Sequence, residues 1–233
     1  MRSLTRPTQI PPPAPDVRAP ISDAREARIG PNSVLQLAQV LDAHLGKAAT
    51  QALLLDAGLT ALPTDSGLMP EGPAARLHQA LRSRHPDAAA MLATEAGART
   101  GDYILAHRIP QPAQHLLRRL PRFLSAPLLA AAISKHAWTF AGSGEFRVAQ
   151  RRPLVFELSD NPIVRGENAL QPLCHWHAAV FQRLFTTLVS PDMRCLETDC
   201  CAQGARTCRF RMQSWATRRY PRGSPRSGRP AAR

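Results

Sequence analysis

The first half of the chain repeats its apolar residues at helical spacing. From Val34 to Leu45 the apolar positions follow a period of about 3.6 residues. Asn32 or Ser33 stands where a helix cap is expected, and Gly46 stands where the helix should end. The same spacing predicts further helices over 47–58, 73–84 and 87–107, with a loop at 59–72.

The helix predicted over 87–107 carries small residues on one face. Ala93, Gly97 and Gly101 are four residues apart, which allows another helix to approach closely. Four prolines then divide the following stretch, and we expect only short helices there: Pro110, Pro112, Pro121 and Pro127.

The second half changes to the alternating pattern of strands. Residues 145–151 and 154–159 alternate and predict a hairpin, followed by a mostly buried helix over 171–189. A second alternating pair lies at 193–198 and 207–212. The sequence therefore predicts an α+β fold, with N-terminal helices packed on an antiparallel sheet of two hairpins separated by a helix.

Composition sets the boundaries of this domain. Residues 1–31 are rich in proline and read as a disordered leader, residues 32–213 as a single domain, and residues 214–233 as a disordered tail. The net charge is +13, but residues 200–233 alone hold nine arginines and no acidic residue. The charge is thus mostly a property of the end of the chain. We expect no nucleic-acid partner, and at most a weak contact of the basic tail with a membrane surface.

The N-terminal residues lack the apolar core of a secretory signal, and no apolar run is long enough to cross a bilayer. We therefore expect a cytoplasmic protein whose cysteines are reduced.

Four of the five cysteines lie within 195–208, and the fifth is Cys174. Cys200 and Cys208 flank a loop that contains Gly204, Glu197 precedes Cys200 by three residues, and Cys174 begins the preceding helix. Three thiolates and one carboxylate complete a tetrahedral zinc site, and four protein ligands would make it structural. Two alternatives fit the spacing: the cysteines are buried apolar residues, or other side chains replace some of the four ligands. The alternative ligands are His175, His177, Cys195 and Cys201.

The run from Glu197 to Phe210 resembles the C-terminal signature of the 4-vinyl-reductase domain family. That signature, Glu-x-x-Cys-x-x-x-Gly-x-x-x-Cys-x-Phe, is matched at Glu197, Cys200, Gly204, Cys208 and Phe210. The family also places a cysteine where this chain has Cys174, and its phenol-sensing members bind zinc through these four positions. The resemblance thus implies zinc at Cys174, Glu197, Cys200 and Cys208, within a related stretch of about 87–213.

Two stretches, AWTFAGSGEFRV and CHWHAAVFQRLF, resemble most closely the bacteriochlorophyll-biosynthesis branch of the family in purple photosynthetic bacteria. One departure concerns the helix after Cys174, where small glycines are usual but this chain has Ala178, Ala179, Phe181 and Arg183. These bulkier side chains would alter a pocket beside that helix. The family fold resembles that of a vesicle-tethering subunit and a haem-sensor-associated domain, and many members are dimers, so we expect a homodimer.

The resemblance implies a protochlorophyllide-type Mg-porphyrin as ligand, held in an apolar pocket. The candidate pocket residues are the aromatic side chains Trp138, Phe140, Phe146, Phe156, Trp176 and Phe181. The family name implies reduction of a vinyl group, which would require NADPH or a flavin, yet the sequence shows no dinucleotide-binding motif. The alternatives are a non-catalytic carrier or assembly factor for a biosynthetic enzyme and, ranked last, a small-molecule sensor. Contacts of the tetrapyrrole with His136 and with Arg118, Arg119 and Arg122 are further hypotheses. A location at the photosynthetic membrane would follow from the basic tail.

Overall fold

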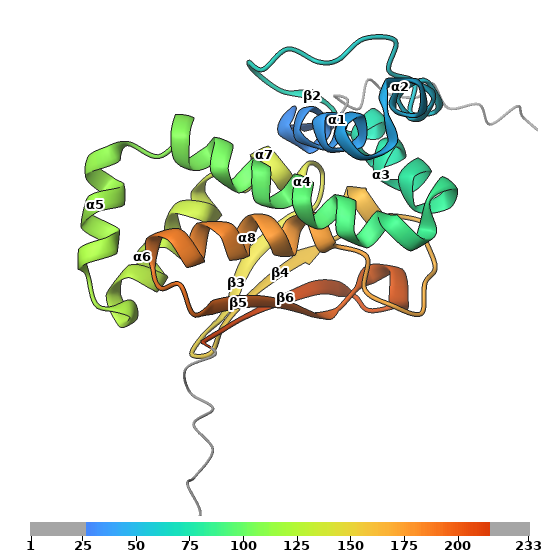
Figure 1. Ribbon diagram of the computed structural model, residues 1–233. Helices are drawn as coiled ribbons and strands as arrows, with labels where there is room; N and C mark the ends of the chain where they lie inside the picture. Colours follow the sequence, from blue (N-terminus) through green and yellow to red (C-terminus); the bar gives the residue numbers. More distant parts are fainter. Residues whose placement is uncertain (1–26, 215–233) are drawn as a thin grey trace, which may run out of the picture.

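The structure is a computed structural model that describes residues 27–214 (Figure 1). The leader predicted over residues 1–26 and the tail predicted over 215–233 lie outside these residues. The elements of the N-terminal half are β1 (Arg28–Ile29), α1 (Asn32–Leu45), α2 (Lys47–Asp56), β2 (Met69–Pro70), α3 (Glu71–Arg84), α4 (Pro86–His107), α5 (Gln111–Arg119), α6 (Arg122–Lys135) and α7 (Trp138–Ala141). Those of the second half are β3 (Glu145–Arg151), β4 (Leu154–Ser159), the 3₁₀ turn η1 (Pro162–Val164), α8 (His175–Leu188), β5 (Met193–Asp199), the 3₁₀ turn η2 (Cys201–Gln203) and β6 (Thr207–Ser214).

The four longer strands form one antiparallel sheet in the order β3-β4-β6-β5. Helix α8 lies across one face of this sheet, α4 lies along α8, and α1 to α3 gather at one end of α4 (Figure 1). The predicted α+β fold of helices on two hairpins separated by a helix is thus confirmed.

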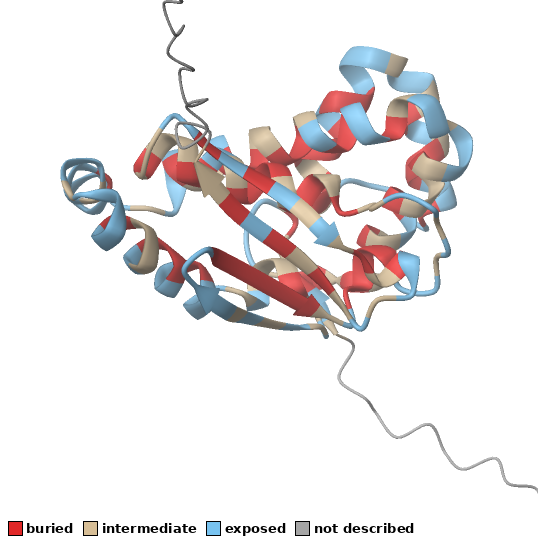
Figure 2. Ribbon diagram, turned by 90° about the horizontal axis from the view of Figure 1, so that it is seen from below, coloured by how far each residue is buried: buried red, intermediate tan, exposed pale blue. Residues whose placement is uncertain are grey.

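The sheet is buried on the side that faces α8. Phe156 and Phe210 are paired across β4 and β6, and both pack beneath Phe181 and Phe185 of α8. The opposite side is more open, and buried and exposed residues alternate along its strands when the sheet is viewed from below (Figure 2). This alternation is the sequence signal from which the strands were predicted.

The small residues of α4 make its close contact with α8 possible. A Cβ atom added at Gly97 would lie 2.3 Å from the carbonyl oxygen of Trp176, and one at Gly101 would lie 2.6 Å from Cβ of Arg183. The predicted face of Ala93, Gly97 and Gly101 therefore packs against α8, with Ala93 itself buried.

Three boundaries differ from the prediction. The folded part begins before Asn32, because Ile29 of β1 is fully buried and β1 pairs with β2. One apolar residue between polar neighbours gives no periodicity to detect. Helix α8 begins at His175, three residues after Pro172, so that Cys174 is the residue that precedes its first turn. Pro127 lies inside α6 and does not end it. The bond it cannot donate would go to the carbonyl of Phe123, an exposed residue near the start of the helix, where water can replace the lost bond.

Candidate metal centre

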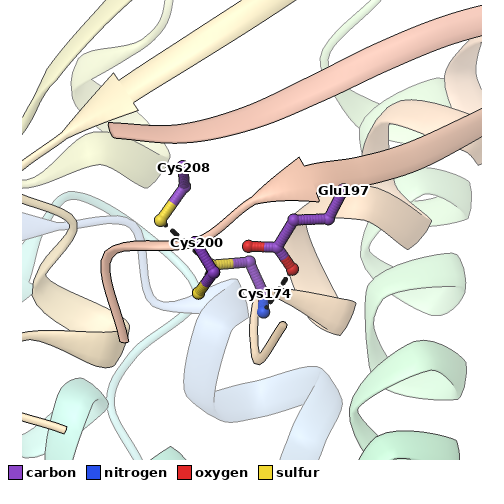
Figure 3. A group of neighbouring side chains, drawn as sticks. All are labelled: Cys174, Glu197, Cys200 and Cys208. Carbon is purple, nitrogen blue, oxygen red and sulfur yellow. Dashed lines mark hydrogen bonds between the residues drawn. The ribbon is translucent and has the colours of Figure 1, made fainter. Parts of the chain in front are cut away.

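Cys174, Glu197, Cys200 and Cys208 point toward a common point between α8 and the β5–β6 hairpin (Figure 3). One ligand atom from each of the four lies within 4.8 Å of the other three. The chain folds this way because Cys174 precedes α8, Glu197 ends the regular pairing of β5, and Cys200 and Cys208 stand on either side of η2. Gly204 adopts a positive φ of 84° at the end of η2, which lets the loop turn back into β6.

The sulfur atoms are spaced as metal ligands and not as a disulfide. Sγ of Cys174 lies 3.8 Å from Sγ of Cys200 and 3.4 Å from Sγ of Cys208. A disulfide would require about 2.05 Å. Two sulfurs of a zinc tetrahedron with bonds of about 2.3 Å would be about 3.8 Å apart.

Glu197 completes the set with an oxygen that lacks a partner. Its Oε2 accepts a hydrogen bond of 2.8 Å from the backbone N–H of Cys174, whereas the buried Oε1 has no hydrogen-bond partner. Burial raises the pKa of this carboxyl to about 8. A buried carboxylate oxygen without a donor is costly unless a cation compensates it, so this atom fits a metal ligand.

The thiols differ in their readiness to ionise. Hydrogen bonds with the Cys174 and Cys208 thiols hold the pKa of Cys200 well below its usual range. Burial raises the pKa of Cys174 well above its usual range. One thiolate is thus favoured before any cation arrives, and a divalent ion would stabilise the others as they release their protons.

Asn161 supports the cluster from a position that the sequence did not reveal. It is fully buried, and its Nδ2 lies 3.2 Å from Sγ of Cys174 and 3.7 Å from Sγ of Cys208, as a donor to both. Its Oδ1 accepts from the N–H of Ile163, which fixes the orientation of the amide. The N–H of Cys201 also donates to Cys208, at 3.3 Å. Such donors stabilise thiolate charge and orient the ligands. Asn161 lies far from the cysteine run in sequence, so no spacing pattern pointed to it.

The alternative ligands lie elsewhere. Nε2 of His177 is 3.3 Å from the carbonyl oxygen of Phe140, and burial lowers the pKa of this histidine to about 4. Cys195 is buried on β5, where burial raises its pKa, and Cys201 is half-buried beside Cys200. Among the described residues, the group that could hold a metal contains neither His175, His177, Cys195 nor Cys201.

Two curated relatives decide the family. The bacteriochlorophyll synthase 23 kDa chain of Cereibacter sphaeroides is 55% identical over 185 residues, which cover 79% of this chain and 90% of that relative. The protein of the same name from Rhodobacter capsulatus is 50% identical over 192 residues, which cover 82% of this chain and 90% of the relative. This chain belongs to the bacteriochlorophyll synthase 23 kDa chain family.

The family model of the 4-vinyl-reductase domain matches residues 154–214 of this member of the 23 kDa chain family. The resemblance to the 4-vinyl-reductase domain family is thereby confirmed. The matched stretch runs from β4 to β6 and includes all four residues of the cluster. It begins later than residue 87, where the sequence resemblance was taken to start.

Solved structures show the same fold at low identity. The Fe(II) unliganded H-NOX protein of K. algicida superimposes with a TM-score of 0.54 and 12% identity, covering 80% of this chain and 96% of that one. A point mutant of that protein gives a TM-score of 0.53 and 11% identity, with the same coverage. The 23 kDa chain family thus shares this fold.

The predicted pocket residues of this family member do not form one group. Phe140, Phe146, Phe156 and Phe181 contact one another, with ring centroids 5.1 to 5.5 Å apart along the chain of contacts. Trp176 is buried apart from them, and its Nε1 donates to Oγ1 of Thr100 at 3.2 Å. Trp138 is 54% exposed, away from the cluster.

His136 is also exposed and lies near a carbonyl of its own helix, with Nδ1 2.9 Å from the oxygen of Ala132. None of the helices within residues 27–214 has the length and apolar character needed to cross a membrane.

Proposed function

We propose that this protein serves bacteriochlorophyll biosynthesis as an accessory chain that binds a chlorophyll-precursor tetrapyrrole, and that one structural zinc ion holds its binding domain together. The pathway is supported by the two relatives, each named as a chain of bacteriochlorophyll synthase. The single observation that carries the metal is the convergence of Cys174, Glu197, Cys200 and Cys208 on one point.

Zinc fits the donor set better than other common ions. Thiolates select zinc over magnesium and calcium, and a borderline carboxylate completes a tetrahedral set. Four protein ligands would leave no open position for water or substrate, so the ion would crosslink the start of α8 to the β5–β6 hairpin. Its contribution would be to folding, since metal-binding energy is folding energy in such sites.

The metal is tested with a matched pair of cysteine variants. Cys200→Ser should abolish stoichiometric zinc and lower the melting temperature of the purified protein. Cys201→Ser, the neighbouring substitution, should retain both, because its side chain is outside the cluster. Elemental analysis and thermal denaturation provide the two readouts. Equal zinc content in the two variants would refute the site.

The tetrapyrrole is supported by the aromatic cluster. Phe156 and Phe181 are fully buried, whereas Phe140 and Phe146 are half-buried and lie where the cluster reaches the surface. A flat apolar ring system could stack on these two outer rings with little rearrangement of the inner ones. Delivery of the bound pigment to a biosynthetic enzyme is the role that follows for an accessory chain.

Reduction of a vinyl group is the second candidate, and the match to the 4-vinyl-reductase domain favours it. A paired assay separates the two. Purified protein is incubated with divinyl protochlorophyllide, with and without NADPH and flavin, and both absorption spectra and extracted pigments are analysed. A red-shifted spectrum without conversion, weakened in a Phe146→Ala variant, is the expected result. Donor-dependent formation of the monovinyl pigment would replace the carrier role with reductase activity, and no spectral change at all would refute tetrapyrrole binding.

A further inference from the structure

Helices α5 and α6 form a hairpin at one end of the molecule, and α5 stands at its outer edge (Figure 1). Pro121 follows directly on Leu120, whose extended backbone (ψ 145°) ends α5 and starts the turn into α6. Of the nine residues of α5, the buried one is Gln114, whose Nε2 donates to the carbonyl oxygens of Leu105 and Ile109. A cavity of about 400 Å³ lies between α5 and α4. The hairpin is therefore held to the domain at few points.

The turn of this hairpin exposes large apolar side chains. They are Leu116, Phe123, Leu124 and Leu128, which are 57%, 62%, 43% and 51% exposed, and we call them the α5–α6 patch. All four lie in the last turns of α5 or the first two turns of α6, and Leu124 and Leu128 are neighbours on one helix face. Single exposed leucines are ordinary, but four around one turn indicate a surface that is covered in the working state.

The charge around the patch is of one sign. From Tyr103 to Gly144 the sequence contains five arginines or lysines and no aspartate or glutamate. Three of them flank the patch, and two of these three bond to uncharged acceptors: Arg118 to the carbonyl oxygen of Thr187 at 3.3 Å, and Arg122 to Oγ of Ser214 at 2.8 Å. Their positive charge is thus not neutralised by these contacts.

The contact between Arg122 and Ser214 also fixes where the last described residue lies, directly beside α6. The sequence that follows Ser214, residues 215–233, contains six arginines and no acidic residue. A second cationic segment, distant from α5 and α6 in sequence, is therefore attached to the chain next to the patch.

The geometry points to the α5–α6 patch as a docking site for an anionic membrane surface, with Leu116, Phe123, Leu124 and Leu128 entering the headgroup boundary and the arginines pairing with lipid phosphate. Exposed leucines and phenylalanine rimmed by arginine are the pattern by which helices lie in the interface of a bilayer. Arginine suits this position because its stem packs along apolar surface while its guanidinium binds phosphate. This inference does not depend on the proposed function, and it differs from the weak tail contact expected from the sequence because the folded hairpin makes the apolar contact.

The test is flotation of the full-length zinc-loaded protein with vesicles. Wild type should float with vesicles that contain phosphatidylglycerol and not with vesicles of phosphatidylcholine alone, and added salt should weaken the binding. The double variant Phe123→Ser/Leu128→Ser should bind about tenfold or more weakly, because it removes two apolar groups from the interface. Leu170→Ser is the matched control, since Leu170 is 94% exposed in a loop outside the patch, and it should bind like wild type.

Two further full-length variants keep the result interpretable. Arg119→Ala leaves the apolar residues intact and should weaken partitioning about fivefold, which corresponds to about 1 kcal/mol per basic residue. A variant with all six tail arginines replaced by serine should bind less but remain sensitive to Phe123→Ser/Leu128→Ser.

Two outcomes would overturn the inference. Vesicle binding that depends on the tail arginines alone, with the Phe123→Ser/Leu128→Ser protein equal to wild type, would show that the patch does not dock. Absence of vesicle binding, together with a wild-type dimer in sedimentation that Leu128→Ser dissociates, would show that a second copy of the chain covers it.

Discussion

At the scale of single residues, the cluster depends on Asn161 as well as on its four candidate ligands. A fully buried amide beside two sulfurs is understandable if those sulfurs carry negative charge, because the amide then donates charge-assisted hydrogen bonds. The sequence alone revealed the ligands through their spacing and family signature. It could not reveal Asn161, since what places this residue is the turn after β4 and not a motif.

Replacing Asn161 by alanine should weaken zinc binding about 10- to 100-fold, the usual effect of losing an orienting partner of a ligand. Competition with a chromophoric chelator measures the change in affinity. Asn168→Ala is the control, because Asn168 is exposed on the following loop. Similar zinc affinities for the two variants would remove Asn161 from the account.

His78 gives the fold a dependence on pH. Its Nε2 lies 3.1 Å from the carbonyl oxygen of Ser33, and burial, aided by the charge of Arg82, lowers its pKa to about 3. In the unfolded chain its pKa is about 6.5. Between these values the unfolded chain holds more protons, so stability should fall as the pH falls, by up to about 1.4 kcal/mol for each unit below 6.5.

The slope is measured by urea denaturation at pH 7.5 and 5.5 under constant zinc, values chosen on either side of about 6.5. The His78→Gln variant should lose less stability over this interval than wild type, although it starts less stable. An identical loss in both proteins would contradict a neutral buried His78.

At the scale of elements, the contact between α4 and α8 positions the cluster, because α8 begins at the residue after Cys174. Its closeness was predictable from the four-residue spacing of Ala93, Gly97 and Gly101. The partner helix was not predictable, since small residues specify a short distance and not which helix fills it.

Gly97→Ala should destabilise the protein by about 1–3 kcal/mol, since the added methyl would meet the backbone of Trp176, which cannot move independently of α8. Gly72→Ala in α3 is the matched control. Its methyl would lie 3.1 Å from Nη1 of Arg76, the end of a flexible side chain, so it should be neutral or stabilise by up to about 1 kcal/mol. Chemical denaturation of both variants decides. A smaller effect at Gly97 than at Gly72 would contradict the packing.

The order of helices and strands followed from periodicity, but the ends of elements did not. Pro127 predicted a break because proline removes a backbone donor, yet its place near the start of α6 makes that loss tolerable. Strand β1 escaped prediction because Ile29 is its one buried residue.

At the scale of the whole molecule, three regions meet around α8. The aromatic core lies beneath it, the cysteine cluster precedes its first residue, and α5 and α6 project beyond its other end (Figure 1). A zinc ion at the cluster would therefore hold α8 on the sheet, which is why its loss should lower the stability of the whole domain and not only of one loop.

X-ray absorption at the zinc edge of the purified wild-type protein is the most direct measurement of this central claim. The account predicts one zinc ion per chain with three sulfur ligands at about 2.3 Å and one oxygen at about 2.0–2.2 Å, the bond lengths of thiolate and carboxylate. A nitrogen ligand or only two sulfurs would contradict the ligand set of Cys174, Glu197, Cys200 and Cys208, and a fully folded protein that takes up no zinc would contradict the structural metal itself.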